Sequence, residues 1–347
     1  MIRSSLVILI VGMICVLLVT CSYPYRLNFD KVRFPDTPIN FEQVNSEYDD
    51  YNSDLPKWLR NYPAISFTLI FSTNRNSEGD NFDFIYFDCQ ATSNFISENN
   101  RIQATYYGKV SYDSLNTTAN ELGPYIIYDS NSDYAQRRFF YATDKSGTLD
   151  IYVVNYHFSN EFKYHGKEEI IKLPEINSNY DEAYPSIYFD DIHKKEVMYY
   201  TSNRDGGFDI YTATSQPDRP IEQSINIEIN KVNELCSEDN DKCPYITGNI
   251  MVFTSDRDGG YGGFDLWYST YNGAEWTEPQ NFGEKINTEY DEYRPVLQIP
   301  DERQEQDNFH NNFMIFSSNR PGGKGGFDLY YVGVDKFEAQ VGLEIGD

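Results

Sequence analysis

The chain repeats one short pattern five times, and this repetition restricts its fold more than any other feature. The clearest copy spans residues 313–331 and reads FMIFSSNRPGGKGGFDLYY. The other copies read IMVFTSDRDGGYGGFDLWY at 250–268, VMYYTSNRDGGFDIY at 197–211, LIFSTNRNSEGDNFDFIY at 69–86 and FFYATDKSGTLDIY at 139–152. Recurrence of one pattern along a chain is typical of repeat architectures, in which every copy adopts the same structure.

Each copy predicts a β-hairpin. Its two apolar runs are short, rich in β-branched and aromatic residues, and ended by Gly and Asp, which favours strands over helices. The turn between the runs contains a Gly-Gly or Ser-Gly pair in most copies, and glycine permits the positive φ of tight hairpins.

A proline lies upstream of each hairpin, and the prolines are 61, 61, 59 and 51 residues apart. They are Pro63, Pro124, Pro185, Pro244 and Pro295. This spacing suits one four-stranded propeller blade with its loops. From the axis outward we expect the proline segment (184–189 in one copy), the FSSNR run, the FDLY run and a variable outer strand such as 274–282.

A lone hairpin cannot bury both of its faces, whereas sheets arranged radially around an axis protect most of their edges. The sequence therefore predicts an all-β protein, a β-propeller of five blades with about four antiparallel strands each. We expect the propeller to span residues 55–347.

The first 21 residues form a separate unit. Arg3 precedes the unbroken apolar run 6–19, which is too short to span a bilayer and fits the h-region of a secretory signal. The run ends in LVTC, which resembles a bacterial lipobox with Cys21 as the lipidated residue. The absence of an acidic cluster after Cys21 favours the periplasmic face of the outer membrane over the cell surface.

Residues 22–54 are expected to form a tether and an N-terminal strand. Within them, 38–51 (PINFEQVNSEYDDY) nearly repeats 279–293 (PQNFGEKINTEYDEY), so this segment should lead into blade one. Either residues 25–34 or residues 337–345 are expected to supply the outer strand of the last blade.

The composition limits the partners. With 54 acidic and 28 basic residues the net charge is -26, which argues against nucleic acid and anionic lipid surfaces. Beyond the signal segment, the remaining cysteines are Cys89, Cys236 and Cys243, and a disulfide between Cys236 and Cys243 is one possibility that spacing alone does not fix.

Charged residues recur on both sides of each hairpin turn, which predicts a structural cross-hairpin charge pair in every blade. The pairs are Arg75 with Asp83, Lys145 with Asp150, Arg204 with Asp209, Arg257 with Asp265, and Arg320 with Asp328.

Motifs for catalysis and metal binding are absent. The sequence contains no GxSxG, HExxH, P-loop or CxxC pattern. The segments 256–260 and 238–241 faintly resemble calcium loops, but their shared glycines and polar residues fit turns. We therefore expect no catalytic residue, no metal and no cofactor, although carboxylates around a propeller axis would suit glycoside hydrolysis.

The repeat unit, with its proline, its S/T-S/T-N-R run and its GGFD(I/L)Y run, resembles the TolB-type, WD-like β-propeller repeat of bacterial envelope proteins. The resemblance covers residues 55–335 and is weakest in the second copy, where Asp144 and Lys145 replace Asn and Arg. It implies a lipid-anchored, non-enzymatic scaffold that contacts envelope or outer-membrane proteins. Binding of glycan or peptidoglycan, favoured by the 30 tyrosines, and glycoside hydrolysis are the alternatives.

Overall fold

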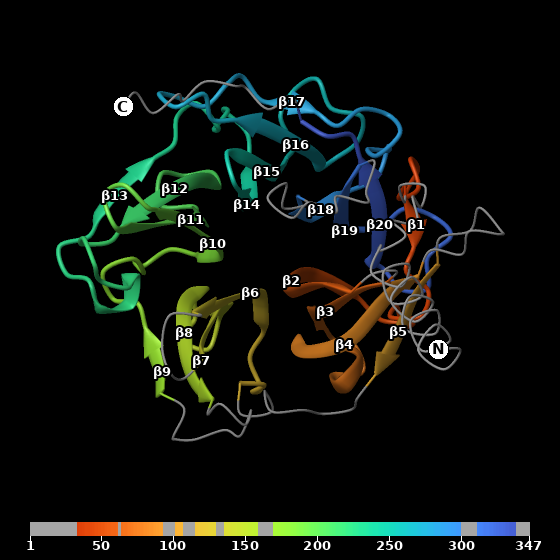
Figure 1. Ribbon diagram of the computed structural model, residues 1–347, viewed down its shortest axis with the longest axis horizontal. Helices are drawn as coiled ribbons and strands as arrows, with labels where there is room; N and C mark the ends of the chain where they lie inside the picture. The colour runs from red at the N-terminus through yellow and green to blue at the C-terminus, as the bar shows by residue number, and fades with distance from the viewer. Residues whose placement is uncertain are drawn as a thin grey trace, which may run out of the picture.

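The computed structural model describes residues 33–61, 64–92, 101–106, 115–129, 135–158, 169–299 and 311–337. In these ranges five four-stranded antiparallel sheets surround a common axis (Figure 1). The prediction of an all-β, five-bladed propeller with four antiparallel strands in each blade is confirmed.

The strands follow one order in every blade, from the axis outward. Blade one contains β2 (Asp50–Asn61), β3 (Ala64–Thr73), β4 (Asp83–Thr92) and β5 (Arg101–Tyr106). Blade two contains β6 (Glu121–Asp129), β7 (Ala135–Thr143), β8 (Asp150–Phe158) and β9 (Glu169–Lys172). Blade three contains β10 (Glu182–Asp190), β11 (Lys195–Ser202), β12 (Asp209–Thr214) and β13 (Glu228–Lys231).

Blades four and five complete the ring. Blade four contains β14 (Asp241–Thr247), β15 (Ile250–Ser255), β16 (Asp265–Thr270) and β17 (Gln280–Asn281). Blade five contains β18 (Glu292–Gln298), β19 (Asn312–Ser318), β20 (Asp328–Val334) and β1 (Ile39–Asn40). Two short 3-10 turns, η1 (Arg75–Ser77) and η2 (Ile221–Gln223), lie outside the sheets.

The recurring proline belongs to a β-bulge in the innermost strand. The residue before it, and the equivalent residue of blade one, have a positive φ of 50–58°, and the register shifts at this point in each blade. These positions are Asn52, Gly123, Tyr184, Cys243 and Arg294. Proline has no N–H to donate, so a bulge accommodates it where a regular central strand would not.

This register corrects the expected alignment of blade one. The residue after its positive-φ position is Ser53, so Ser53 and not Pro63 corresponds to the prolines of the other blades. Pro63 itself lies outside the described residues.

The N-terminal part of the chain closes the ring. β1 pairs with β20, with Ile39 opposite Tyr331, and the Phe41 N–H donates to the Leu329 carbonyl at 2.8 Å. β1 thus takes the position in blade five that β17 takes in blade four, as the near-repeat of the two linkers indicates. The outer strand of blade five is therefore Ile39–Asn40 and neither of the expected segments 25–34 and 337–345, and the propeller includes residues before the predicted start at 55.

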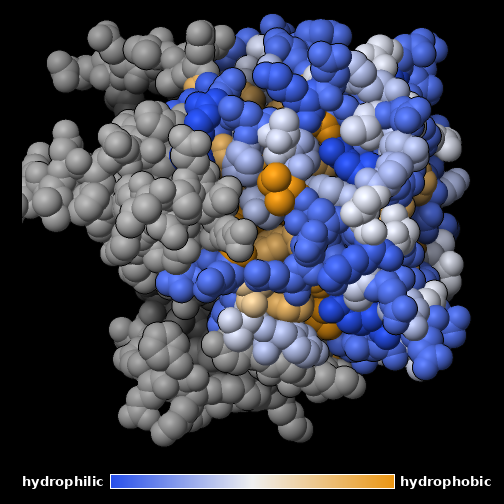
Figure 2. All heavy atoms as spheres, turned by 90° about the vertical axis from the view of Figure 1, so that its right-hand side faces the viewer, coloured by the Kyte–Doolittle hydropathy of each residue, from blue (hydrophilic) through white to orange (hydrophobic). Residues whose placement is uncertain are grey.

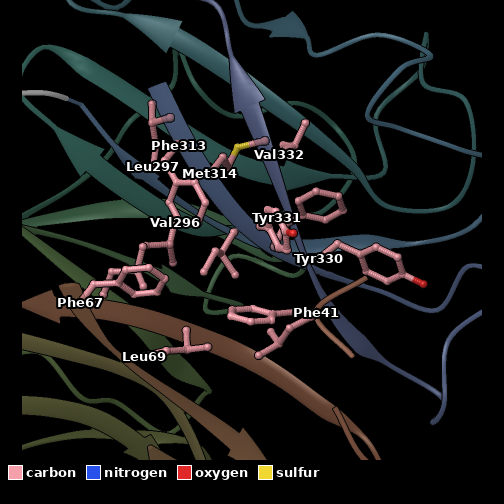
Figure 3. Packing of buried hydrophobic residues seen from close by; sticks show 14 of the residues in the cluster. Phe41, Phe67, Leu69, Val296, Leu297, Phe313, Met314, Tyr330, Tyr331 and Val332 are labelled. Atoms are coloured by element: carbon pink, nitrogen blue, oxygen red, sulfur yellow. The ribbon is translucent and has the colours of Figure 1, made fainter. Parts of the chain in front are cut away.

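Most of the buried side chains form clusters between neighbouring blades. The cluster between blades five and one includes Phe41, Phe67, Phe313 and Tyr331 (Figure 3). A smaller cluster lies at the axis and contains Leu122, Ala183, Tyr184 and Cys243. The outer face at blades five and one is mainly hydrophilic, in keeping with the acidic composition (Figure 2).

The described part of the chain contains no helix long and apolar enough to cross a membrane. The predicted signal segment and the predicted lipidation site at Cys21 lie outside the described residues, as does all of the segment 337–345 except Phe337.

Candidate functional site at the propeller axis

The repeated arginines pair with carboxylates on the innermost strands, not across their own hairpins. The Nη2 atoms of Arg75, Arg204, Arg257 and Arg320 lie 2.5–3.0 Å from Asp50, Glu182, Asp241 and Glu292 respectively. The predicted cross-hairpin pairs are therefore wrong. The register explains why: Ser318 pairs with Glu292 on one side and with Asp328 on the other, and Arg320 turns toward Glu292.

The aspartates that begin the third strands have other partners. In four blades these partners are on the outermost strand. In blades three, four and five, Asp209 pairs with Lys231 at 2.7 Å, and Asp265 and Asp328 accept from Asn281 and Asn40. In blade two Asp150 pairs with Lys172 at 2.7 Å, while Asp83 in blade one accepts from Asn76. In blades two to five these aspartates thus hold the outer half of the sheet.

Each linker between blades is fixed by a recurring set of hydrogen bonds. In blades five, one, two and four an asparagine side chain accepts from and donates to one backbone residue of the third strand. The asparagines are Asn45, Asn116, Asn177 and Asn287. The recurrence of the linker sequence therefore has a structural origin.

An Asp–Asn pair lies at each of the five junctions and joins the last residue of the linker to the end of the second strand of the blade that follows. The side chain of the linker residue also accepts a backbone N–H from the preceding blade. The pairs are Asp49–Asn74, Asn120–Asp144, Asp181–Asn203, Asn240–Asp256 and Asp291–Asn319. Two junctions carry the pair in the reverse order, so each junction combines one carboxylate with one amide donor.

Blade two departs from this pattern. Lys145 stands where the other blades have arginine, and its side chain is exposed. Among the described residues the buried Glu121 carboxylate therefore receives hydrogen bonds from Thr117 and Thr143 and none from a guanidinium. Burial raises the pKa of Glu121 to about 7.

The structure does not support the possible disulfide. Cys236 and Cys243 are both free thiols. In its linker Cys236 takes the place of the asparagine that bonds to the third strand, and its Sγ accepts the Ile210 N–H at 3.3 Å. Cys243 is buried at the axis. The third cysteine, Cys89, is buried in the core of blade one.

The contacts above give a structural role to the arginine, aspartate and asparagine of the repeat motif. They do not explain the phenylalanine that precedes the aspartate in the GGFD run. The side chain of this phenylalanine lies at the axis. An arc of half-buried rings and one amine runs from blade three through four and five to blade one. It comprises Phe208, Lys242, Phe264, Tyr293, Phe327, Tyr51 and Phe82, and we call it the axial surface.

Neighbouring members of the axial surface are in contact. The Phe264 and Tyr293 ring centroids are 5.5 Å apart, and those of Phe327 and Tyr51 are 5.8 Å apart. The Lys242 Nζ lies 4.0 Å from the Phe208 centroid and 5.0 Å from that of Phe264, within the range of cation–π contacts. In blade two the aliphatic Leu122 and Leu149 continue the circle.

Arg294 fills the axis beneath this surface. It is fully buried, its Nη2 donates to the Pro124 carbonyl of blade two at 3.3 Å, and its guanidinium lies 5.7 Å from the Tyr184 ring. Its Nε and Nη1 have no hydrogen-bond partner among the described residues. The side chain thus reaches across the axis and closes it.

Asp54 is the one carboxylate that the described innermost strands place in the interior of the axis. It is 1% exposed and accepts the Ile126 N–H at 2.9 Å. Burial raises its pKa to about 6, although the positive charge of Arg294 acts in the opposite direction. The equivalent positions in the other blades are Tyr125, Ser186, Tyr245 and Val296.

At these inner-strand positions the axis holds one carboxylate and not a pair. Glycoside hydrolysis generally uses two carboxylates about 5–10 Å apart on either side of the scissile bond. Asp54 has no carboxylate counterpart at the equivalent positions of the other blades. The axial surface presents mainly aromatic faces and phenol groups to a ligand.

A groove of about 610 Å³ lies elsewhere, between blades four and five at the outer edge. Tyr268 contacts Phe282 and Phe337 in its wall, with ring centroids 4.9 and 5.1 Å apart. Arg33 and Phe337 in this wall adjoin segments outside the described residues. We place the candidate site at the axis, where all five blades contribute.

Sequence reasoning did not identify Tyr51, Asp54, Lys242, Tyr293 or Arg294. The alignment of blade one on Pro63 concealed the equivalence of Asn52 and Ser53 with the Arg294–Pro295 pair. Correct alignment of the five inner strands would have shown that these positions vary between blades, in contrast to the uniform motif.

Comparison with known proteins defines the fold. A scan against protein-family models and a search of curated proteins find no match. Among solved structures, the chain is similar to an N-acetylgalactosamine deacetylase from F. plautii in complex with blood group B trisaccharide. That match has a TM-score of 0.51 and 12% identity, and covers 87% of this chain and 94% of that chain.

Two further solved structures are similar to the chain. An α-L-arabinofuranosidase from Podospora anserina in complex with cellotriose matches with a TM-score of 0.50 and 11% identity, covering 88% of this chain and 97% of that one. An endo-1,4-β-xylanase from Bacteroides thetaiotaomicron matches with a TM-score of 0.51 and 12% identity, covering 86% and 95%.

These findings correct the functional expectations. The assignment to TolB-type repeats of envelope lipoproteins is contradicted, because no family model matches and these similar structures are carbohydrate-active enzymes. The same structures overturn the expectation of a non-enzymatic protein scaffold. At this level of identity the likeness establishes the five-bladed fold, and function has to be argued from the site.

Proposed function

We propose that the protein is a carbohydrate-active protein that binds an oligosaccharide on its axial surface. The observation that carries this proposal is the arc of half-buried aromatic rings, from Phe208 to Phe82, around the axis of the propeller. Aromatic faces combine a large apolar area with, in tyrosine, a polar tip, which suits ligands that alternate apolar and hydroxyl surfaces.

The other features of the molecule are consistent with this role. The net charge of -26 disfavours nucleic acid, the other common ligand of aromatic platforms. Two of the solved structures with the same fold are complexes with a trisaccharide and with cellotriose.

A glycan array followed by calorimetric titration of the strongest ligand tests the proposal. Tyr293→Ala and Phe264→Leu should each weaken binding at least about tenfold, since aromatic anchors commonly dominate binding energy. Phe264→Leu is compatible with the fold because the second repeat carries Leu149 at this position. Tyr188→Ala serves as the control, because Tyr188 is 41% exposed near the far end of its inner strand. Equal affinity in all three variants would exclude the axial surface.

Cleavage of the bound glycan is the second candidate function, favoured by Asp54. A carboxyl group with a pKa of about 6 remains partly protonated near neutral pH, as a general acid requires. Release of reducing ends that is lost in Asp54→Asn would support it. Turnover that is unchanged in Asp54→Asn would exclude Asp54 as the acid.

A further inference from the structure

The axial surface already accommodates one positive charge. The Lys242 ammonium packs against the faces of Phe208 and Phe264, and no ion pair of Lys242 is found among the described residues. The corresponding residues of the other blades are Tyr51, Leu122, Ala183 and Tyr293, so Lys242 is an exception at its position. An aromatic surface that holds an ammonium from its own chain has the electrostatics to hold one from a ligand.

Carboxylates surround this surface. Each blade junction contributes one half-buried aspartate, and the junctions adjoin the axial rings: Asp49 accepts the backbone N–H of Phe327 and Asp291 that of Phe264. The five are Asp49, Asp144, Asp181, Asp256 and Asp291. Among the described residues their hydrogen bonds come from amide and backbone N–H donors, so the negative charge is not neutralised by a cation.

Lys242 does not make the electrostatic potential of the axial surface positive. Asp181 and Asp256 both act electrostatically on its ammonium. The Arg294 guanidinium beneath the surface has the Asp54 carboxylate near it at the axis, and one amine among five carboxylates leaves the surface negative. The overall charge of -26 reinforces this at long range. A uronic or sulfated sugar would therefore be repelled, whereas a cationic ligand would be attracted.

We infer that the oligosaccharide bound at the axial surface carries protonated amines, so that the ligand class is a glycan with free amino sugars. The inference rests on the proposed function and specifies its ligand. The ligand ammonium would stack on Phe264 or Phe208 and compete there with Lys242, while the neighbouring sugar ring would cover Tyr293.

Calorimetric titrations with three tetrasaccharides test this inference: a glucosamine tetramer, its fully N-acetylated form and a uronic acid tetramer. The titrations are run at about pH 6, where sugar amines are largely protonated. The glucosamine tetramer should bind about tenfold or more tightly than the N-acetylated one, and the difference should shrink at high salt because it is electrostatic.

Lys242→Tyr gives a sharper test, because the inference predicts that this substitution increases the preference for the glucosamine tetramer. Tyrosine occupies this position in repeats one and five, so the variant should fold, and Lys242→Leu repeats the test with the residue of repeat two. Removal of the resident ammonium should raise the ratio of glucosamine-tetramer to N-acetylated-tetramer affinity about threefold or more. Melting curves confirm that both variants are folded.

The outcomes separate the two proposals. Preference for the uronic acid tetramer, with loss of its binding in Lys242→Tyr, would overturn the inference and assign Lys242 an anion-binding role. Equal binding of charged and neutral tetramers would also overturn it while leaving glycan binding intact. Failure of every oligosaccharide to bind would refute the proposed function itself.

Discussion

At the residue scale, the motif arginines neutralise buried carboxylates. Arg320 donates to Glu292, to the Ile286 carbonyl and to Ser318, so one side chain ties an inner strand to its neighbour and to the preceding linker. Arg320 stabilises the fold mainly because Glu292 would otherwise be a buried charge without a partner, and less through the attraction itself.

Arg320→Ala should therefore lower the free energy of unfolding by about 3–5 kcal/mol, the usual cost of leaving a buried charge without its partner. Denaturant unfolding measures the loss. Lys145→Ala is the matched control, because Lys145 holds the same position in blade two with an exposed side chain, and it should change stability by less than about 0.5 kcal/mol. Equal effects of the two substitutions would contradict the assigned role.

The burial of Glu121 makes the stability of the fold depend on pH. Its pKa is raised to about 7 in the folded protein, above the unfolded value of about 4.3. A group of this kind stabilises the fold fully below the unfolded pKa, and the stabilisation is lost as the pH rises through the folded pKa. Besides Thr117 and Thr143, the charge of Asp83 acts on Glu121 and raises the pKa further.

Glu121→Gln should thus increase stability at about pH 8 by roughly 1–3 kcal/mol relative to the original protein, with a smaller difference at about pH 5. Lys145→Arg, which supplies the guanidinium found in the other blades, should flatten the pH dependence as well. Thermal melts across this pH range measure both effects. Glu292→Gln serves as the contrast and should destabilise at either pH, because it leaves the Arg320 guanidinium without its carboxylate.

At the element scale, the junctions between blades depend on one carboxylate and one amide. At the junction of blades four and five the Asp291 N–H donates to the Asn319 Oδ1, and the Asn319 Nδ2 donates to the Asp291 carboxylate at 2.9 Å. The junction of Asn240 with Asp256 makes the same two bonds with the residue types exchanged.

This symmetry predicts a compensating double substitution. Asn319→Asp places two carboxylates in contact and Asp291→Asn places two amides in contact, so each single variant should be less stable. The combined variant restores the arrangement found at Asn240 and Asp256 and should recover most of the loss. A double-mutant cycle should give a coupling energy of about 1–2 kcal/mol. Additive effects would show that the pair is not a unit.

The strands could be predicted from the sequence where they follow the repeated motif. The order of strands within a blade follows from the hairpin motif and the upstream proline, and it agrees with the structure in blades two to five. Blade one was misaligned because Ser53 replaces proline, so the local signal was absent. The arginine partners were missed because Asp328 and Glu292 lie on opposite sides of Ser318, a choice that the hairpin sequence alone does not express.

The candidate site was less predictable for a related reason. Its residues come from separate inner strands, and positions such as those of Lys242 and Arg294 differ from blade to blade. Repetition identifies what is common to the blades, whereas a ligand site depends on what differs among them. Arg294 contacts Pro124 across 170 residues, which no local pattern encodes.

At the scale of the whole molecule, the ring is closed by a short strand from the opposite end of the chain. β1 provides the fourth strand of blade five, and Phe41 beside it is 2% exposed and packs edge-on against Tyr331. Leu173 is its counterpart between blades two and three, since both donate their N–H to the third strand of the preceding blade.

Phe41→Ala should weaken ring closure as well as packing. Both Phe41→Ala and Leu173→Ala should lower stability by about 2–5 kcal/mol through lost burial. Only Phe41→Ala should also reduce the dependence of the unfolding free energy on denaturant, because blade five can then separate before the rest unfolds. Identical slopes for the two variants would indicate that the ring unfolds as one unit regardless of its closure.

The most direct test of the central claim is a crystal structure of the protein with the strongest oligosaccharide from the glycan array. The proposal predicts sugar density over Tyr293 and Phe264, with at least one sugar ring facing an aromatic face of the axial surface. Density confined to the outer groove between blades four and five, or to any other surface, would contradict the assignment of the site to the propeller axis.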